Sequence, residues 1–302
     1  MYMGNLPSLL HYDTQEQKFP RKFFRENTWE KYCGNFPGIR LYFLRICTMK
    51  GGAMLKRTII KLSGEALSGS SNHSFCDATI DSIAIQLQSA LASGTEIALV
   101  VGGGNFWRGR VGQQVMDRVK ADQIGMLATV MNAIYLSEAF KRHGIRSVVM
   151  TPMPFANMTT VYDKCTALSL MASGVITFHA AGLCHPFFST DSVAALRGAE
   201  LEADCVLYTK NGVGGVYNKA PGNGVVAHMY KTLPYKTAIA QQLQFVDGAA
   251  LQILVEADIP SFVFGLDEAD GIARACKRDS GQAGFGTLLN SVVEEEFYVN
   301  PH

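Results

Sequence analysis

The chain has 302 residues, of which 48% are hydrophobic, and its formal net charge is +1 at pH 7. A chain of this length and composition can bury a large core, which excludes disorder for most of it. Lys and Arg are dispersed rather than clustered, and no apolar run approaches the roughly 20 residues that span a bilayer, so neither a nucleic-acid partner nor a membrane span is predicted.

The seven cysteines are dispersed, and none of them forms a Cys-x-x-Cys pair. An odd number without close pairs argues against a disulfide framework and against a zinc cluster. Free thiols are typical of a reducing compartment, so a cytoplasmic protein is expected. The histidines also lack metal-ligand spacing, and the sequence assigns no metal ligand.

Residues 1–53 differ from the rest because they are rich in aromatic residues and proline and show no regular period. We interpret them as an unstructured N-terminal extension, or as an over-extended reading frame whose true start is Met49 or Met54. The charged stretch at 13–31 disfavours a secretory or transit peptide. Residues 54–302 are expected to form the folded domain.

The first regular pattern is a strand at 58–60 followed by a turn at 61–64. A helix is then predicted over 80–91, where apolar residues recur at intervals of three and four. Gly94 is expected to end this helix in a C′ position, and a strand follows at 97–101.

The same order of helix, glycine and strand recurs twice more along the chain. The predicted segments are 124–135 with Gly144 and 148–150, then 168–172 with Gly174 and 175–178, and further strands are expected at 205–208 and 262–264. Strands with continuous apolar runs are covered on both faces, and right-handed crossovers make them parallel. The sequence therefore predicts an α/β fold whose central sheet is mostly parallel, with ligands beyond the carboxyl ends of the strands.

Two glycine-containing turns follow predicted strands. Lys61, Ser63 and Gly64 combine a cation with a small hydroxyl and a glycine, a pattern suited to phosphate oxygens. In the segment 102–109 (GGGNFWRG), three consecutive glycines follow a buried strand, and Arg108 supplies a planar guanidinium. Such glycines favour close backbone approach to a ligand, although a tight structural turn is the alternative.

The third candidate is the segment 181–191 (AGLCHPFFSTD), which runs from a strand to the start of a helix. Ser189 or Thr190 is expected to cap that helix, and the free amides of its first turn form an anion site. The capping role alone is the other interpretation. Asp191 would repel phosphates unless it held a metal or oriented a lysine.

These residues resemble the bacterial UMP kinase (uridylate kinase) family of amino acid kinases. The resemblance covers about residues 54–289. It rests on motifs whose order and spacing match those of the family: 61–67 (KLSGEAL), 102–109 (GGGNFWRG), 121–129 (ADQIGMLAT), 186–192 (PFFSTDS) and 210–217 (KNGVGGVY). It implies a three-layer αβα sandwich, a homohexamer, ATP and UMP as ligands, Mg with the ATP, and phosphorylation of UMP to UDP in pyrimidine nucleotide biosynthesis.

The resemblance also implies roles for individual positions. ATP would contact Lys61, Leu62, Ser63, Gly64, Gly104, Arg108, Asn211, Tyr217 and Ala220. UMP would contact Gly103, Asp122, Leu183, Cys184, His185, Pro186, Phe187, Phe188, Ser189 and Thr190. Catalysis would rely on Lys61, Arg108, Asp191 and Asp204.

The chain departs from the family pattern in two segments. Leu183, Cys184 and His185 replace the usual Thr-Gly-Asn, while Gly214 and Ala220 stand where two Asp residues are usual. Each lost hydrogen bond to a nucleotide weakens binding by roughly 1 kcal/mol. Two alternatives stay open: another amino acid kinase, and a UMP- or UTP-binding regulatory protein with little catalysis.

Overall fold

The computed structural model describes residues 54–69, 74–107, 116–221, 226–277 and 284–298. All of them belong to the second of the two units into which the chain divides, Thr48–His302. The proposed extension 1–53 and the predicted site residue Arg108 lie outside the described residues.

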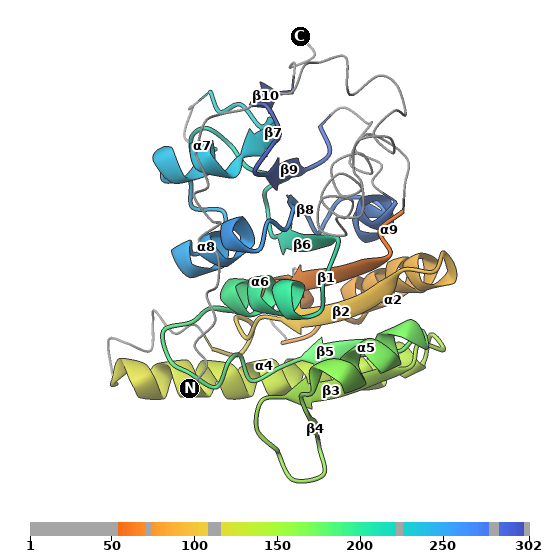
Figure 1. Cartoon of the computed structure of the whole chain (residues 1–302). Coiled ribbons are helices and arrows are strands. Elements are labelled where there is room, and N and C mark those ends of the chain that lie inside the picture. The colour runs from red at the N-terminus through yellow and green to blue at the C-terminus, as the bar shows by residue number, and fades with distance from the viewer. Residues whose placement is uncertain (1–53, 70–73, 108–115, 222–225, 278–283, 299–302) are drawn as a thin grey trace, which may run out of the picture. The chain divides into compact units, whose positions relative to one another are not determined.

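The described residues contain one ten-stranded sheet with the order β10-β7-β9-β8-β6-β1-β2-β5-β3-β4, drawn edge to edge in Figure 1. The strands are β1 Arg57–Leu62, β2 Glu96–Val101, β3 Ser147–Thr151, β4 Thr160–Val161, β5 Ile176–His179, β6 Cys205–Lys210, β7 Tyr230–Pro234, β8 Ser261–Gly265, β9 Thr287–Asn290 and β10 Glu296–Phe297. Only the β8–β9 and β10–β7 pairs are antiparallel in this described sheet. The predicted, mostly parallel sheet is therefore confirmed.

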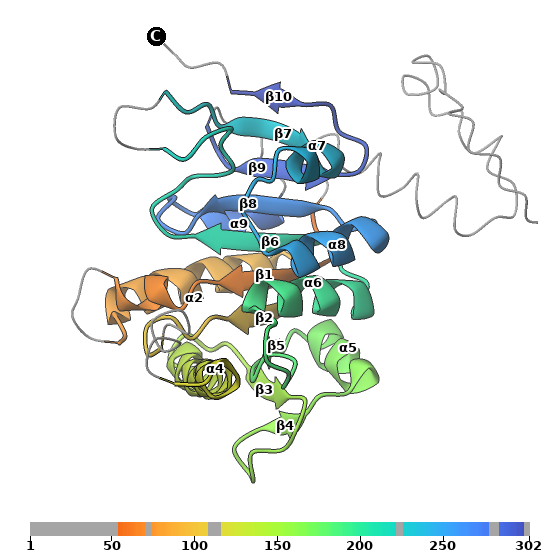
Figure 2. The same cartoon turned by 90° about the vertical axis from the view of Figure 1, so that its left-hand side faces the viewer.

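Helices cover both faces of the sheet. They are α2 Asp77–Ala92, α4 Arg118–Lys141, α5 Lys164–Ala172, α6 Thr190–Glu200, α7 Tyr235–Ala240, α8 Gly248–Glu256 and α9 Gly271–Cys276, with a short 3₁₀ turn, η3, at Glu65–Ser68. Helices α2, α4 and α9 pack on one face, and α5 to α8 pack on the other (Figure 2). This arrangement confirms the three-layer sandwich.

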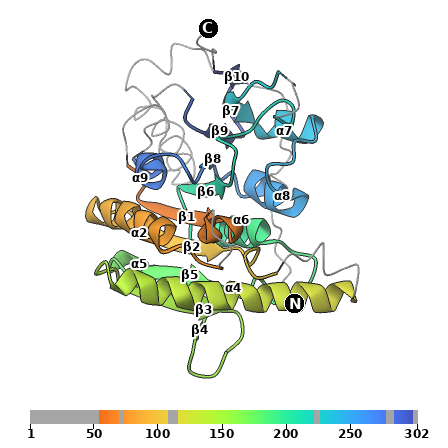
Figure 3. The ribbon, with the colours of Figure 1, turned by 180° about the vertical axis from the view of Figure 1, so that it is seen from behind.

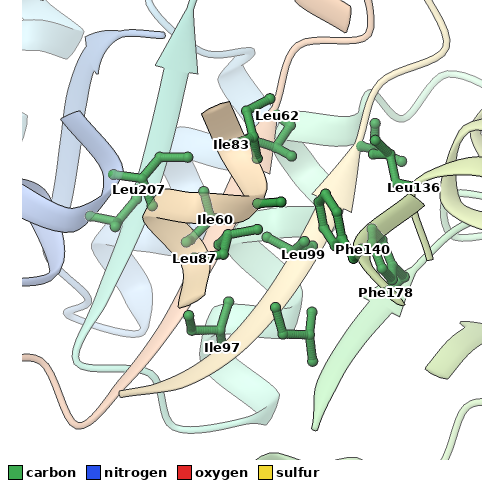
Figure 4. Packing of buried hydrophobic residues seen from close by; sticks show 14 of the residues in the cluster. Ile60, Leu62, Ile83, Leu87, Ile97, Leu99, Leu136, Phe140, Phe178 and Leu207 are labelled. Carbon is green, nitrogen blue, oxygen red and sulfur yellow. The ribbon is translucent and has the colours of Figure 1, made fainter. Parts of the chain in front are cut away.

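The two layers of core follow from the alternation of side chains along each strand. Ile60 and Leu62 point to the face covered by α2, where Ile83 and Leu87 meet them (Figure 4). Ile59, between them in sequence, belongs to the second core beneath α6 and α8. Strand β1 is thus buried on both faces, which explains its continuous apolar run.

Helix α4 is longer than the sequence predicted. The expected helix began at residue 124, but the structure begins it at Arg118, because the Asp117 side chain accepts a hydrogen bond from the Lys120 amide at 3.3 Å. Figure 3 shows α4 lying across β3 and β5. Within the described ranges, no helix is long and apolar enough to cross a membrane.

Candidate active site

The predicted phosphate loops meet at one edge of the sheet. Strand β1 is parallel to both β2 and β6, with Leu62 opposite Val101 and Lys61 opposite Tyr208. The segments that follow these three strands must therefore emerge on the same side. The amide of Gly102 donates to the carbonyl of Leu62 at 3.0 Å, which joins the glycine loop to the end of β1.

The two glycine turns pack backbone against backbone. A Cβ atom placed on Gly64 would lie 2.4 Å from the carbonyl oxygen of Gly102 and 2.7 Å from the amide nitrogen of Gly104. A Cβ on Gly103 would lie 2.9 Å from the Cβ of Ala128 on α4. Close approach, rather than a left-handed turn, is what requires glycine here.

Three backbone amides at this contact between the glycine turns can bind a ligand. Among the described residues, no acceptor receives a hydrogen bond from the amides of Gly64, Gly103 or Gly104. Sheltered backbone N–H groups are costly to leave unpaired, and clustered amides suit the oxygens of an anion. The geometry supports the interpretation of these turns as a phosphate cradle.

A carboxylate between two lysines borders this cradle. Lys61 Nζ lies 2.9 Å from Asp191 Oδ1, and Lys210 Nζ lies 3.7 Å from Asp191 Oδ2. Burial alone would raise the pKa of Asp191, but the two ammonium groups outweigh it and hold that pKa below its ordinary value. Asp191 therefore orients lysines, which was one of the two roles that the sequence left open.

Lys210 is a site residue that sequence reasoning missed. Lys210 is the last residue of β6, and Lys61 is the last but one of β1. Burial lowers the pKa of Lys210, while Asp191 opposes that shift. The signal was available, because a lysine closing a buried apolar strand is the same pattern in both cases. Together the three side chains carry one net positive charge toward the glycine turns.

The loop after β5 carries three non-glycine residues in the left-handed region. Ala181, Cys184 and Phe187 have φ angles of 62°, 56° and 71°. A non-glycine residue in this region costs roughly 1–2 kcal/mol, so the surrounding contacts must hold the loop. Cys184 stands where the resembling family has glycine, and the loop keeps the backbone conformation that glycine adopts easily.

Helix α4 holds the far part of that loop. Asp122 Oδ2 accepts a hydrogen bond from the Phe187 amide at 2.9 Å, and the Arg118 guanidinium lies 4.7 Å from the centre of the Phe187 ring. Phe187 and Phe188 are both exposed. The structure therefore brings Asp122 and the predicted acceptor loop together.

Ser189 caps α6, as predicted, and contacts a residue that the sequence did not single out. Its hydroxyl accepts from the Asp191 amide at 2.9 Å and donates to Asp247 Oδ2. The Ser192 hydroxyl donates to Asp247 Oδ1 at 2.8 Å, and the same carboxylate caps α8 through the Ala250 amide. Asp247 thereby fixes the start of α6 against the start of α8.

The predicted adenosine side contains a third residue that the sequence analysis missed, Glu268. A Cβ placed on Gly214 would lie 3.8 Å from both the Tyr217 hydroxyl and Oε1 of Glu268. The Leu266 amide donates to the Lys210 carbonyl at 2.9 Å, which brings the loop of Glu268 to the end of β6. A carboxylate from another loop thus lies near the position where Asp is usual. Asn211 and Ala220 are exposed, beyond β6.

Asp204 lies outside this site, which corrects the sequence prediction. Its Oδ2 accepts hydrogen bonds from the amides of Lys56 and Arg57 at 2.8 and 3.0 Å. Those two amides lie at the start of β1, whereas Lys61 and the glycine turns lie at its end. Asp204 precedes β6 in the chain, so a parallel sheet places it at the opposite edge.

Comparison with known proteins agrees with this geometry. The family model described as "Amino acid kinase family" matches residues 56–265. The crystal structure of UMP kinase from Bacillus anthracis is 32% identical with a TM-score of 0.76, over 82% of this chain and 100% of that one. UMP kinase from Ureaplasma parvum is 28% identical with a TM-score of 0.73, over 78% and 98%. Uridylate kinase from Archaeoglobus fulgidus, 23% identical with a TM-score of 0.56 over 77% and 99%, shares the fold.

Proposed function

The chain belongs to the amino acid kinase family, and we propose that it is a UMP kinase that transfers the γ-phosphoryl group of ATP to UMP. The observation that carries this proposal is the convergence of the two glycine turns with the Lys61–Asp191–Lys210 cluster. Amides and ammonium groups gather where the triphosphate of ATP and the phosphate of UMP would meet, and an acceptor loop hydrogen-bonded to Asp122 borders them.

The reaction needs alignment and charge neutralisation rather than a general base. A phosphate oxygen of UMP attacks the γ-phosphorus of ATP, and the oxygen that bridges the β- and γ-phosphorus leaves with ADP. The attacking oxygen is already anionic, so no side chain has to remove a proton. Lys61 and Lys210 would stabilise the transferring group, and the amides of the glycine turns would orient it.

The two nucleotides would bind on opposite sides of the glycine loop. ATP would use Lys61 to Gly64, Gly104 and the residues beyond β6, which are Asn211, Tyr217 and Ala220. UMP would use Gly103, Asp122 and the segment 183–190. Arg108, outside the described residues, is proposed to bind phosphate because it follows the glycine loop and carries a guanidinium fork.

The donor set at the site fits Mg²⁺ carried by ATP. Among the described residues there is no group of three His, Cys, Asp or Glu side chains that could hold a metal ion. Two carboxylates lie beside the glycine turns: both lysines engage Asp191, and Glu65 lies against Gly104. Mg²⁺ is commonly bound through phosphates with one or two carboxylates, and there it neutralises phosphate charge.

The proposal also covers the oligomeric state of the protein and its location in the cell. We expect the homohexamer that the family resemblance implies, and α4 offers an apolar face for it: Ile124, Leu127, Met131 and Ile134 are 37–52% exposed. The dispersed, unpaired pattern of cysteines in the sequence favours a location in the reducing cytoplasm. Residues 1–53 are proposed to form an extension, and residues 54–302 the kinase domain.

A coupled assay with purified protein tests the function. ADP formation is followed with ATP, Mg²⁺ and each of UMP, CMP and AMP, and turnover is expected with UMP in clear preference. Equal turnover of the three nucleotides would contradict the assignment. Calorimetric binding of UMP or UTP without any turnover would instead support the regulatory alternative.

A further inference from the structure

One face of helix α4 contacts both loops of the candidate site. Asp122, Gly125, Thr129 and Asn132 follow one another at intervals of three, four and three, which places them on the same face. Asp122 holds the acceptor loop, and Gly125 lies against Gly103, whose added Cβ would be 2.9 Å from the Gly125 carbonyl oxygen. Two polar residues further along this face have no assigned role.

Asn132 is fully buried and holds the glycine loop. Its Nδ2 donates to the carbonyl of Gly102 at 2.6 Å, and its amide pairs reciprocally with the side chain of Asn105 at 2.7 and 2.9 Å. Asn105 is also anchored, because its Nδ2 lies 2.8 Å from the Ser74 carbonyl. The loop of three glycines is therefore held at both ends by one side chain of α4.

Thr129 holds the start of the acceptor loop. Its hydroxyl accepts a hydrogen bond from the Ala181 amide at 2.9 Å and donates to the Met126 carbonyl at 2.7 Å. Ala181 is the first of the three non-glycine residues with left-handed backbone in that loop. Thr129 is buried, with 3% of its surface exposed, so water does not compete readily for this bond.

We propose that Thr129 and Asn132 are positioning residues for phosphoryl transfer, which set the acceptor loop and the glycine loop at a fixed separation along α4. This inference rests on the proposed function. Successive residues of a helix rise by about 1.5 Å, so two anchors three positions apart fix the two loops within roughly 4.5 Å of each other along the axis. A misplacement of about 1 Å between reacting groups can lower the rate about 100-fold.

The test compares Thr129→Val with Thr129→Ser. Valine keeps the shape but removes the acceptor for the Ala181 amide, whereas serine keeps the hydroxyl. We expect Thr129→Val to lower kcat about 10- to 100-fold with KM for UMP and ATP within about threefold, and Thr129→Ser to restore most of the loss. Amide exchange of Ala181 should rise about tenfold or more in Thr129→Val alone.

A matched control separates positioning from stability. Thr58 is a buried threonine on β1 whose hydroxyl donates to the Cys205 carbonyl at 2.9 Å, away from both loops. Thr58→Val should lower the melting temperature without lowering kcat. The proposal is overturned if Thr129→Val and Thr58→Val have the same kcat, or if the exchange of Ala181 does not change.

Asn132→Leu provides a second test and should raise the exchange of the hydrogen-bonded amides of the glycine loop, those of Gly102 and Phe106. If it does not fold, the two Thr129 variants still decide the proposal. If the wild-type protein shows no turnover of UMP, the proposed function fails, but the exchange of Ala181 still tests whether Thr129 anchors the loop. Unchanged exchange there would overturn the positioning role independently of activity.

Discussion

The ammonium of Lys61 lies 2.9 Å from one carboxylate oxygen of Asp191, while Lys210 approaches the other oxygen at 3.7 Å. One carboxylate therefore keeps two cations beside each other at the end of the sheet. Without it, the two ammonium groups would repel and separate.

Replacing Asp191 by Asn should disable the reaction while leaving the fold in place. The amide retains the size of the carboxylate but no longer orients Lys61 and Lys210, so we expect kcat to fall about 100-fold or more. Steady-state kinetics with ATP and UMP measure this effect. A fall of less than about threefold would contradict the role of the pair.

Asp204→Asn is the matched comparison, because the same substitution is made at the opposite edge of the sheet. Asp204 accepts from the amides of Lys56 and Arg57, so the variant should lose about 0.5–2 kcal/mol of stability and keep its kcat. A large loss of kcat in folded Asp204→Asn would restore the sequence prediction that the structure corrects.

Gly64→Ala should be strongly destabilising although its backbone conformation suits alanine. Gly64 has φ −60° and ψ −36°, but the new methyl group would lie 2.4 Å from the Gly102 carbonyl oxygen. We expect a loss of about 1–3 kcal/mol and of nucleotide binding. Gly248→Ala, with nothing within 4 Å, should change stability by no more than about 0.5 kcal/mol in urea unfolding.

Glu268→Gln should weaken ATP and leave UMP unaffected. If the carboxylate near Gly214 serves the adenosine side, losing one charge-assisted hydrogen bond raises KM for ATP about fivefold or more. Glu202→Gln is the control, because Glu202 pairs with Lys164 away from the site. Equal KM values for ATP in the two variants would exclude a role for Glu268.

His179 should make folding sensitive to acid. Burial lowers the pKa of His179 to about 3, with Arg197 adding to the effect, so the imidazole is neutral in the folded protein. The unfolded chain binds a proton near pH 6.5, and stability falls as pH falls from 6.5 toward 3, by up to about 1.4 kcal/mol per unit. Urea unfolding at pH 7 and pH 5 should show a smaller difference for His179→Gln. An identical difference would contradict the assignment.

The sequence predicted the central strands and β8, but it did not predict β4, β7, β9 or β10. Strands β1, β2, β5 and β6 are buried on both faces and read as continuous apolar runs. Strand β7, by contrast, carries two adjacent polar residues, Lys231 and Thr232, and ends in Pro234, and β10 has two residues. Short or interrupted strands carry too few residues for a period to be detected.

The site could be predicted where a motif stays within one loop. The glycine turns and Asp191 were identified because each lies directly after a strand or at the start of a helix. Lys210 could have been found by the pattern that Lys61 shows, a lysine at the end of a buried strand. Asp247 and Glu268 depend on contacts between distant segments, which local patterns do not report. Asp204 directly precedes β6, and residues before a parallel strand lie at the edge of the sheet away from the ligand.

Both outer strands of the described sheet, β4 and β10, have two residues each. An edge this short offers an incoming chain few free amides and carbonyls, so one sheet cannot readily be continued into a neighbouring molecule's sheet. Copies of this protein can therefore meet through helix faces without the risk of joining strand to strand. That restriction favours a closed assembly over a fibre.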